Sequence, residues 1–320
     1  MQQTSPLPQT PWVGWWASAQ ATVKAYWDLV KPKIIFLLLV TTAGAMWLAG
    51  NGHVDPLLLA VTLTGGALAS ASAHAINMVY DRDIDEVMPR THTRPMPQGQ
   101  IRVRSALIFA LVLAVAAFVL LHTYANLLSA LLAMSGIVFY VGIYTHWLKR
   151  TTTQNIVIGG AAGAIPPLVG WAAVAGSLDT TAWVLFTIIF LWTPPHFWAL
   201  AILKKEDYAK AGIPMLPVVK GNLETARQMR LYTLALLAAS VLLVYPLGVM
   251  GYVYGLAALG LGLAVLAQVE ALMRDPEDRV QAKRVFMTAN TYLLLLYGAM
   301  ALDSSLPDGA VLSAWIAHLG

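Results

Sequence analysis

The hydrophobic pattern of this sequence consists of long apolar runs separated by short polar connections. A helix needs about 20 apolar residues to cross the hydrocarbon core of a bilayer. The runs do not alternate in polarity at every second residue, as the strands of a membrane barrel would, so we predict helices. Nine segments qualify as spans: 34–50, 56–79, 104–122, 126–147, 155–176, 181–203, 229–249, 252–273 and 285–302.

The composition supports this assignment. Of the 320 residues, 58% are hydrophobic and 11% are charged, whereas a soluble domain carries about 25% charged residues. The mean hydropathy is +0.65. One soluble core cannot absorb so much apolar surface. The predicted fold class is therefore an all-α polytopic membrane protein, and soluble fold classes are excluded.

The basic residues predict the orientation of the chain. If all nine segments cross the membrane, all 20 Lys and Arg residues lie on one face. The positive-inside rule then predicts a cytoplasmic N-terminus and an external C-terminus. We expect three parts: a cytoplasmic or interfacial segment (1–33), a membrane domain (34–302) and an external tail (303–320). Because tryptophan favours the headgroup layer, we predict an interfacial helix at about 12–30, which contains Trp12, Trp15, Trp16 and Trp27.

The most informative polar pattern lies at the end of the second span. Asn77, Asp81 and Asp85 have the spacing i, i+4, i+8, which places them on one face of a continuous helix. Two carboxylates one turn apart repel each other unless a cation lies between them. Oxygen ligands of this kind suit Mg²⁺, which often joins carboxylates to substrate phosphates. A solvated helix end would explain one Asp, but an Asn at membrane depth before two stacked Asp favours a metal site.

Basic residues surround this acidic pattern. Arg90 and Arg94 follow it beside prolines, and guanidinium groups match phosphate oxygens. Arginine in such a loop also serves ordinary topology, but its position next to the Asp pair favours phosphate. The candidate diphosphate-binding residues are Lys31, Lys33, Arg90, Arg94, Lys149, Arg150, Lys204 and Lys205, and Asp207 joins Asn77, Asp81 and Asp85 as a candidate catalytic residue.

At these residues the sequence resembles the UbiA-type intramembrane prenyltransferases, whose first signature is Asn-x-x-x-Asp-x-x-x-Asp. The resemblance extends over nearly the whole chain, with nine helices and two cytoplasmic motif loops in the same order. Within that family the chain is most similar to the haem-prenylating branch, through residues 31–33, 77–95, 195–200 and 207–217.

The sequence departs from the family pattern in the second loop. Many members carry a second Asp-x-x-x-Asp there, but Lys204 and Tyr208 occupy those positions and leave Glu206 and Asp207. This departure puts a second Mg²⁺ held entirely by carboxylates in doubt. Lys204 offers its own charge to a diphosphate in place of the metal's charge.

The resemblance implies a magnesium-dependent enzyme that transfers the farnesyl group of farnesyl diphosphate to a vinyl group of haem b. Addition of water then gives haem O, on the route to the haem A of cytochrome oxidase, and diphosphate is released. The implied Mg²⁺ ligands are Asn77, Asp81 and Asp85. Candidate haem contacts are His196 and His74, both in the inner half of a predicted span.

The resemblance also implies a place in the cell and partners. It suggests a bacterial inner membrane with the active site facing the cytoplasm, contacts with membrane lipid, and a downstream haem-modifying membrane enzyme. We expect no nucleic-acid partner.

Three rival hypotheses remain. A prenyltransferase with an aromatic or chlorin acceptor is disfavoured by Lys204, Tyr208 and the context of His196. A divalent-cation transporter is expected to place polar residues near the bilayer midplane on several helices, whereas this chain concentrates its carboxylates at one edge. A non-catalytic assembly factor leaves the ordered metal and diphosphate residues unexplained.

Overall fold

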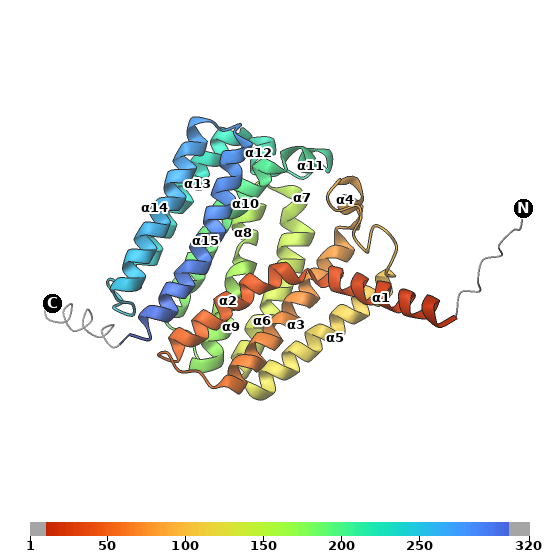
Figure 1. Ribbon diagram of the computed structural model, residues 1–320, viewed down its shortest axis with the longest axis horizontal. Coiled ribbons are helices and arrows are strands. Elements are labelled where there is room, and N and C mark those ends of the chain that lie inside the picture. The colour runs from red at the N-terminus through yellow and green to blue at the C-terminus, as the bar shows by residue number, and fades with distance from the viewer. Residues whose placement is uncertain (1–10, 307–320) are drawn as a thin grey trace, which may run out of the picture.

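The architecture is a bundle of helices. A computed structural model describes the backbone of residues 11–306 and the side chains of residues 19–306. These described residues form helices and no strands, and the long helices lie side by side (Figure 1). The predicted all-helical class is confirmed. The side chains of Trp12, Trp15 and Trp16 and most of the predicted tail lie outside the described residues.

The long helices follow the predicted apolar runs, and short helices fill the connections between them. The elements are α1 (Pro11–Val30), α2 (Pro32–Ala49), α3 (Pro56–Tyr80), α4 (Arg82–Val87), α5 (Val103–Tyr124), α6 (Leu127–Val138), the π-helix η1 (Phe139–Leu148), α7 (Lys149–Thr151), α8 (Asn155–Gly159), α9 (Ala161–Ala175), α10 (Thr180–Leu203), α11 (Lys205–Lys210), α12 (Leu216–Val219), α13 (Gly221–Val241), α14 (Tyr252–Arg274) and α15 (Arg279–Asp303).

Eight helical segments in the described part of the chain are long and apolar enough to cross a membrane. The ninth expected span, 229–249, is not among them. Its helix, α13, starts earlier and ends at Val241. Glu224, Arg227 and Arg230 lie in its first half and lower its apolar character. Pro246, which has no N–H, lies in the turn that follows.

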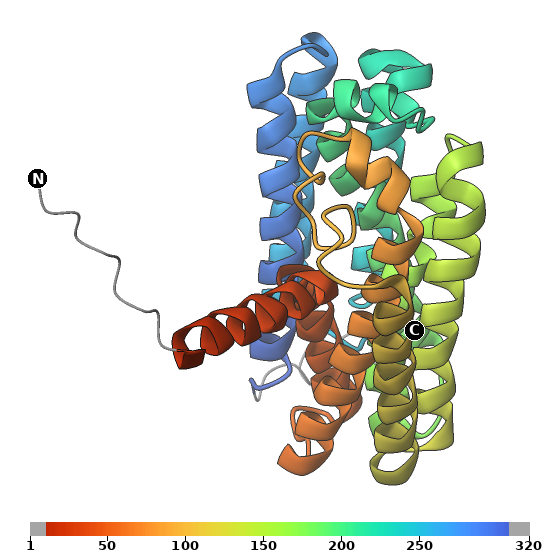
Figure 2. The same ribbon diagram turned by 90° about the vertical axis from the view of Figure 1, so that its right-hand side faces the viewer.

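Helix α1 confirms the predicted helix near the N-terminus, and its second half packs against α3 and α5. It projects from the side of the molecule, across the direction of the long helices (Figure 2). Val23 and Trp27 are exposed on it, while Leu29 is buried at its junction with the bundle. The chain then turns at Lys31, whose φ of 54° lies in the left-handed region that a long side chain rarely adopts.

Two irregularities shape the interior of the bundle. The span that begins with α6 continues as the π-helix η1, a form that is frequent at functional sites. The next span is interrupted at Gly160, between α8 and α9. A Cβ atom at Gly159 would lie 2.3 Å from a ring carbon of Tyr144, so the glycine permits the close approach of η1 and α8.

At the end of the bundle remote from α11 and α12, the C-terminus of α15 clamps the start of α14. The carboxylate of Asp303 is buried and accepts the backbone N–H groups of Gly251, Val253 and Tyr254, at 2.5, 3.0 and 3.3 Å. The first N–H groups of a helix have no partner within the helix, and a negative charge there also suits the helix dipole. Asp303 therefore joins the last two helices.

Replacement of Asp303 by alanine is expected to lower the free energy of unfolding by about 2 kcal/mol, because buried N–H groups lose their acceptor. The midpoint of heat-induced loss of monodisperse protein, followed by size-exclusion chromatography in detergent, should fall by a few degrees. Asp303→Asn keeps one acceptor oxygen and should lose less. Equal midpoints for Asp303→Ala and the unmodified protein would contradict this role.

Candidate functional site

The predicted acidic face forms where α3 ends. The backbone N–H of Asp81 donates to the Asn77 carbonyl at 2.9 Å, and that of Asp85 donates to the Asp81 carbonyl at 2.8 Å. These bonds carry the helical spacing across the short break between α3 and α4. Asn77, Asp81 and Asp85 are each 2–3% exposed, so the structure brings the three predicted metal ligands together in a buried position.

Two lysines from distant parts of the chain bind this acidic face. The Lys31 Nζ donates to Asn77 Oδ1 at 2.8 Å, and the Lys149 Nζ lies 2.5 Å from Asp81 Oδ2. The same Asp81 oxygen accepts from Asn77 Nδ2 at 2.8 Å. Burial, together with the nearby Arg94 charge, lowers the pKa of Lys31 to about 7. Both lysines were predicted to bind a diphosphate. In this structure they contact Asn77 and Asp81, two of the predicted metal ligands.

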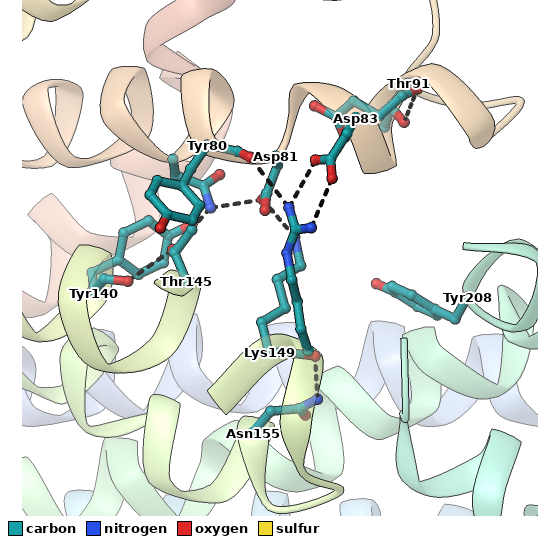
Figure 3. A network of polar contacts seen from close by, with 12 residues as sticks. Tyr80, Asp81, Asp83, Thr91, Tyr140, Thr145, Lys149, Asn155 and Tyr208 are labelled. Atoms are coloured by element: carbon teal, nitrogen blue, oxygen red, sulfur yellow. Dashed lines mark hydrogen bonds and ion pairs between the residues drawn. The ribbon is translucent and has the colours of Figure 1, made fainter. Parts of the chain in front are cut away.

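Thr145 and Asn155 support the network and were not predicted from sequence. The Thr145 hydroxyl accepts from Asn77 Nδ2 at 3.0 Å and donates to the Tyr140 carbonyl at 2.8 Å. The Asn155 Nδ2 donates to the Lys149 carbonyl at 3.3 Å. Figure 3 shows Asp81, Thr145 and Lys149 meeting beside the end of α3. No sequence motif marks Thr145, because its position depends on the π-helix.

The third predicted metal ligand, Asp85, is paired with an arginine. The Arg94 Nη1 lies 2.8 Å from both carboxylate oxygens of Asp85. The loop that carries Arg94 is held in place by Met96 and Ile101, which are buried against α3 and α5. Each of the three predicted metal ligands is thus bound by one basic side chain in this structure.

Arg150 lies outside this buried cluster. It pairs with the exposed carboxylate of Asp83 through two bonds of 2.7 Å. The hydrogen bond from Arg150 lowers the pKa of Asp83 to about 2. The structure therefore gives Arg150 a surface ion pair and does not place it at Asp81 or Asp85.

The second loop meets the first through Tyr208. The Arg90 Nη2 donates to the Tyr208 hydroxyl at 3.3 Å, and its guanidinium carbon lies 5.5 Å from the centre of that ring. Burial raises the pKa of Tyr208. The other candidates of this loop are not part of the network: the side chains of Lys204, Lys205 and Asp207 form no hydrogen bond or ion pair with any described residue.

The donor set of the buried cluster fits a magnesium ion. The Oδ1 atom of Asp81 is buried and has no hydrogen-bond partner among the described residues, although buried polar atoms normally have one. The described residues contain no group of three or more His, Cys, Asp or Glu placed to hold a metal. A metal here would therefore use two carboxylates and one amide oxygen, with water or substrate oxygens completing its shell, as Mg²⁺ commonly does.

A cavity of about 470 Å³ adjoins the cluster. Its wall is formed by α2, α3, α6, η1, α8, α9, α10 and α15, and most of it is apolar. His74 and Tyr140 connect the cavity to the cluster, since they lie one turn before Asn77 and Thr145 respectively. Lys33 also faces the cavity. Apolar space with a few polar groups is typical of a ligand site.

Both predicted haem contacts line this cavity at a similar depth. His74 lies six residues before the end of α3 and His196 seven residues before the end of α10, or roughly 10 Å along each helix. The His74 ring meets the edge of Tyr140 at 5.5 Å. The His196 ring is stacked between Trp192 and Phe286, at 4.4 and 4.6 Å between ring centres. The structure thus brings the two histidines to one cavity.

The comparison with protein families identifies the class of this membrane protein. The sequence matches the model of the UbiA prenyltransferase family over residues 37–300, and the chain belongs to that family. The resemblance predicted from the sequence motifs is confirmed.

Curated relatives narrow this similarity. A protein of Nostoc sp. (strain PCC 7120 / SAG 25.82 / UTEX 2576) named protoheme IX farnesyltransferase is 59% identical over 282 residues, which cover 88% of this chain and 89% of that protein. A protein of Synechococcus sp. (strain JA-2-3B'a(2-13)) with the same name is 63% identical over 281 residues, covering 88% and 84%.

Solved structures agree on the fold. A UbiA homolog from Archaeoglobus fulgidus bound to GPP and Mg²⁺ matches with a TM-score of 0.67 at 14% identity, covering 86% of this chain and 99% of the homolog. A UbiA homolog from Aeropyrum pernix K1 in its apo form matches with a TM-score of 0.71 at 17% identity, covering 87% and 100%. At these identities the likeness establishes the fold alone.

Proposed function

We propose that the chain transfers the farnesyl group of farnesyl diphosphate to a vinyl group of haem b, with addition of water. The products are diphosphate and haem O. Haem O carries the added hydroxyl group and is the precursor of haem A. Support comes from relatives named protoheme IX farnesyltransferase at about 60% identity over most of the chain. The observation that carries the proposal is the junction of a buried, cation-rich acidic cluster with a largely apolar cavity that contains two histidines.

The polar cluster suits the diphosphate end of the substrate. Asn77, Asp81 and Asp85 would hold Mg²⁺, which when bound neutralises the charge of the departing diphosphate. Lys31, Lys149 and Arg94 now pair with Asn77 Oδ1, Asp81 Oδ2 and the Asp85 carboxylate, next to the Asp81 Oδ1 atom that such a metal would use. We therefore propose that these pairs open when the metal and substrate bind together, and that the released cations turn to the phosphate oxygens.

Arg90, Lys33 and the second loop would complete the rim. Arg90 is held by Tyr208 and lies between the two loops. Lys204, Lys205 and Asp207 are unpaired within the described residues. Their contribution would depend on movement of α11 toward the diphosphate. Arg150, which pairs with Asp83 at the surface, would act only at long range.

The cavity would protect the reacting carbon. Tyr140, Tyr144, Trp192 and Phe286 line it together with aliphatic side chains. Their ring faces would stabilise positive charge on the allylic carbon as the diphosphate leaves, while the apolar wall excludes bulk water. Haem b would lie between His74 and His196, with its vinyl group toward the cluster.

The position in the cell is part of the same proposal. The chain is a multi-pass membrane protein by its eight apolar helices and its family. We propose that α13 forms a ninth crossing, since it packs between α10 and α14. All Lys and Arg residues then face the cytoplasm of a bacterial inner membrane, with residues 1–33 on that face and 303–320 outside. A downstream haem-modifying enzyme would receive the product from the lipid.

Purified protein incubated with haem b, farnesyl diphosphate and Mg²⁺ is expected to form haem whose mass has increased by one farnesyl group and one hydroxyl group. Mass spectrometry of the extracted pigment measures this directly. A folded protein that prenylates only an aromatic or chlorin acceptor would overturn the haem assignment. Metal-driven ion flux into liposomes without any prenyl transfer would favour a transporter instead.

A further inference from the structure

The cavity contains a polar corner that the transfer of the farnesyl group does not explain. His196 is 8% exposed and lies in the stack of Trp192 and Phe286. Its Nδ1 atom is buried and has no hydrogen-bond partner within the described part of the chain. Its Nε2 atom forms no hydrogen bond with any described residue and is not among the fully buried atoms, so it is the ring nitrogen that can be reached from the cavity that His196 lines.

His74 differs in this respect. Both of its ring nitrogens are buried without a partner in residues 19–306, which leaves no room for a small polar molecule beside them. Of the two histidines in the cavity, only His196 therefore presents a ring nitrogen to open space. The stack also prevents the His196 ring from turning, so this nitrogen keeps a fixed direction.

Asn290 supplies a second polar group in the same corner. It lines the cavity one helical turn after Phe286, the residue that stacks on His196. Its Nδ2 donates to the Phe286 carbonyl at 3.2 Å, while its Oδ1 accepts no hydrogen bond from any described residue. A water molecule in a protein interior needs about two to four polar partners. His196 and Asn290 offer two, and the substrate's own groups can add others.

We propose that His196, aided by Asn290, holds the water that ends the reaction and accepts its proton at Nε2. This inference rests on the proposed function, because it concerns the second half of haem farnesylation. A neutral imidazole is a suitable acceptor for such a proton. His196 is then a catalytic residue, and Asn290 is a positioning residue that acts on the same water.

The reaction begins at the diphosphate end of the substrate. The C1–O bond of farnesyl diphosphate breaks, and its electron pair leaves with diphosphate. The terminal vinyl carbon of haem bonds to C1, which leaves a positive charge on the vinyl carbon next to the pyrrole ring. The water oxygen bonds to that carbon while one of its protons passes to His196, which later returns it to solvent. If water is not delivered, the same cation loses a proton from the neighbouring carbon and forms an alkene.

The product of a His196→Phe variant tests this proposal. Phenylalanine keeps an aromatic ring in the stack but has no proton acceptor. We expect the ratio of alkene to alcohol in the farnesylated haem to rise at least about tenfold, seen by mass spectrometry as a product lighter by one water. Asn290→Leu should shift the ratio in the same direction by a smaller factor. In the matched variant His74→Phe, a slower reaction should still give the alcohol at the wild-type ratio.

The outcomes separate the two proposals. If the unmodified protein forms no farnesylated haem, the proposed function fails. If it forms haem O and His196→Phe gives the same ratio of products, the role of His196 is refuted. If His196→Phe yields no prenylated haem at all, the ratio of alkene to alcohol in the Asn290→Leu variant becomes the test, and an unchanged ratio overturns the proposal. A shift in the His74→Phe variant alone would assign the water to His74 instead.

Discussion

Asp81→Asn is expected to lower the rate of haem farnesylation by about 1,000-fold, the size of effect seen when a charge-stabilising group is removed from an active site. Asp81 is buried, and its Oδ1 atom has no hydrogen-bond partner in the part of the chain that the structure describes. It is therefore the carboxylate oxygen most available to a metal. Asparagine keeps the shape of the side chain but removes the negative charge that Mg²⁺ needs.

The rate is measured as haem O formed per minute at saturating Mg²⁺ and farnesyl diphosphate, with the heat stability of each variant as a check on folding. Asp83→Asn is the matched control. Asp83 lies two residues away and is also paired with a basic side chain, but its side chain is 60% exposed. Its replacement should change the rate by less than about twofold. Substantial activity in Asp81→Asn, or an equal loss in Asp83→Asn, would refute the metal assignment.

The spans were predictable because apolar length alone determines them. The exception is α13, where the predicted segment began at 229 and left out Glu224 and Arg227. A helix inside a bundle can carry such charges near one end, where they meet partners such as Glu270 of α14, 3.8 Å from Arg230. The hydropathy of a segment depends on its own residues only and does not include the partners that adjacent helices provide.

The acidic face was predictable because its three residues are close in sequence. The helical spacing continues through the backbone bonds of Asp81 and Asp85 even though α3 ends at Tyr80. Its partners were not predictable. Lys31 reaches Asn77 from 46 residues away, and Lys149 reaches Asp81 from 68 residues away. These pairs form only because the turn between α1 and α2 and the start of α7 lie beside the end of α3.

The second loop shows the limit of motif alignment. Lys204, Lys205 and Asp207 were chosen because they carry charge, but Tyr208 is the residue of α11 that is buried against the first loop. Its ring and hydroxyl contact Arg90. Tyr208, which stands where many family members carry an aspartate, therefore joins the two loops. Sequence spacing alone does not show which side of so short a helix faces the site.

Lys149→Gln is expected to change the binding of metal and of substrate in opposite directions. The Lys149 Nζ occupies Asp81 Oδ2 at 2.5 Å, and its side chain is only 12% exposed. This positive charge repels a metal ion bound at the neighbouring Oδ1 atom of Asp81, so its removal should tighten the binding of Mn²⁺, used as a probe in place of Mg²⁺, by about tenfold. Farnesyl diphosphate loses a phosphate contact, so its affinity should fall by a similar factor and the rate by about 100-fold.

Electron paramagnetic resonance of free Mn²⁺ measures the first effect, and displacement of a radiolabelled farnesyl diphosphate measures the second. Lys205→Gln makes the same change of charge at a side chain without an ion pair, and it should leave Mn²⁺ binding unchanged. Weaker binding of Mn²⁺ in Lys149→Gln would mean that Lys149 organises the metal site. Opposite shifts follow only if the positive charge of Lys149 opposes the metal ion when it binds alone and attracts the diphosphate when the substrate binds.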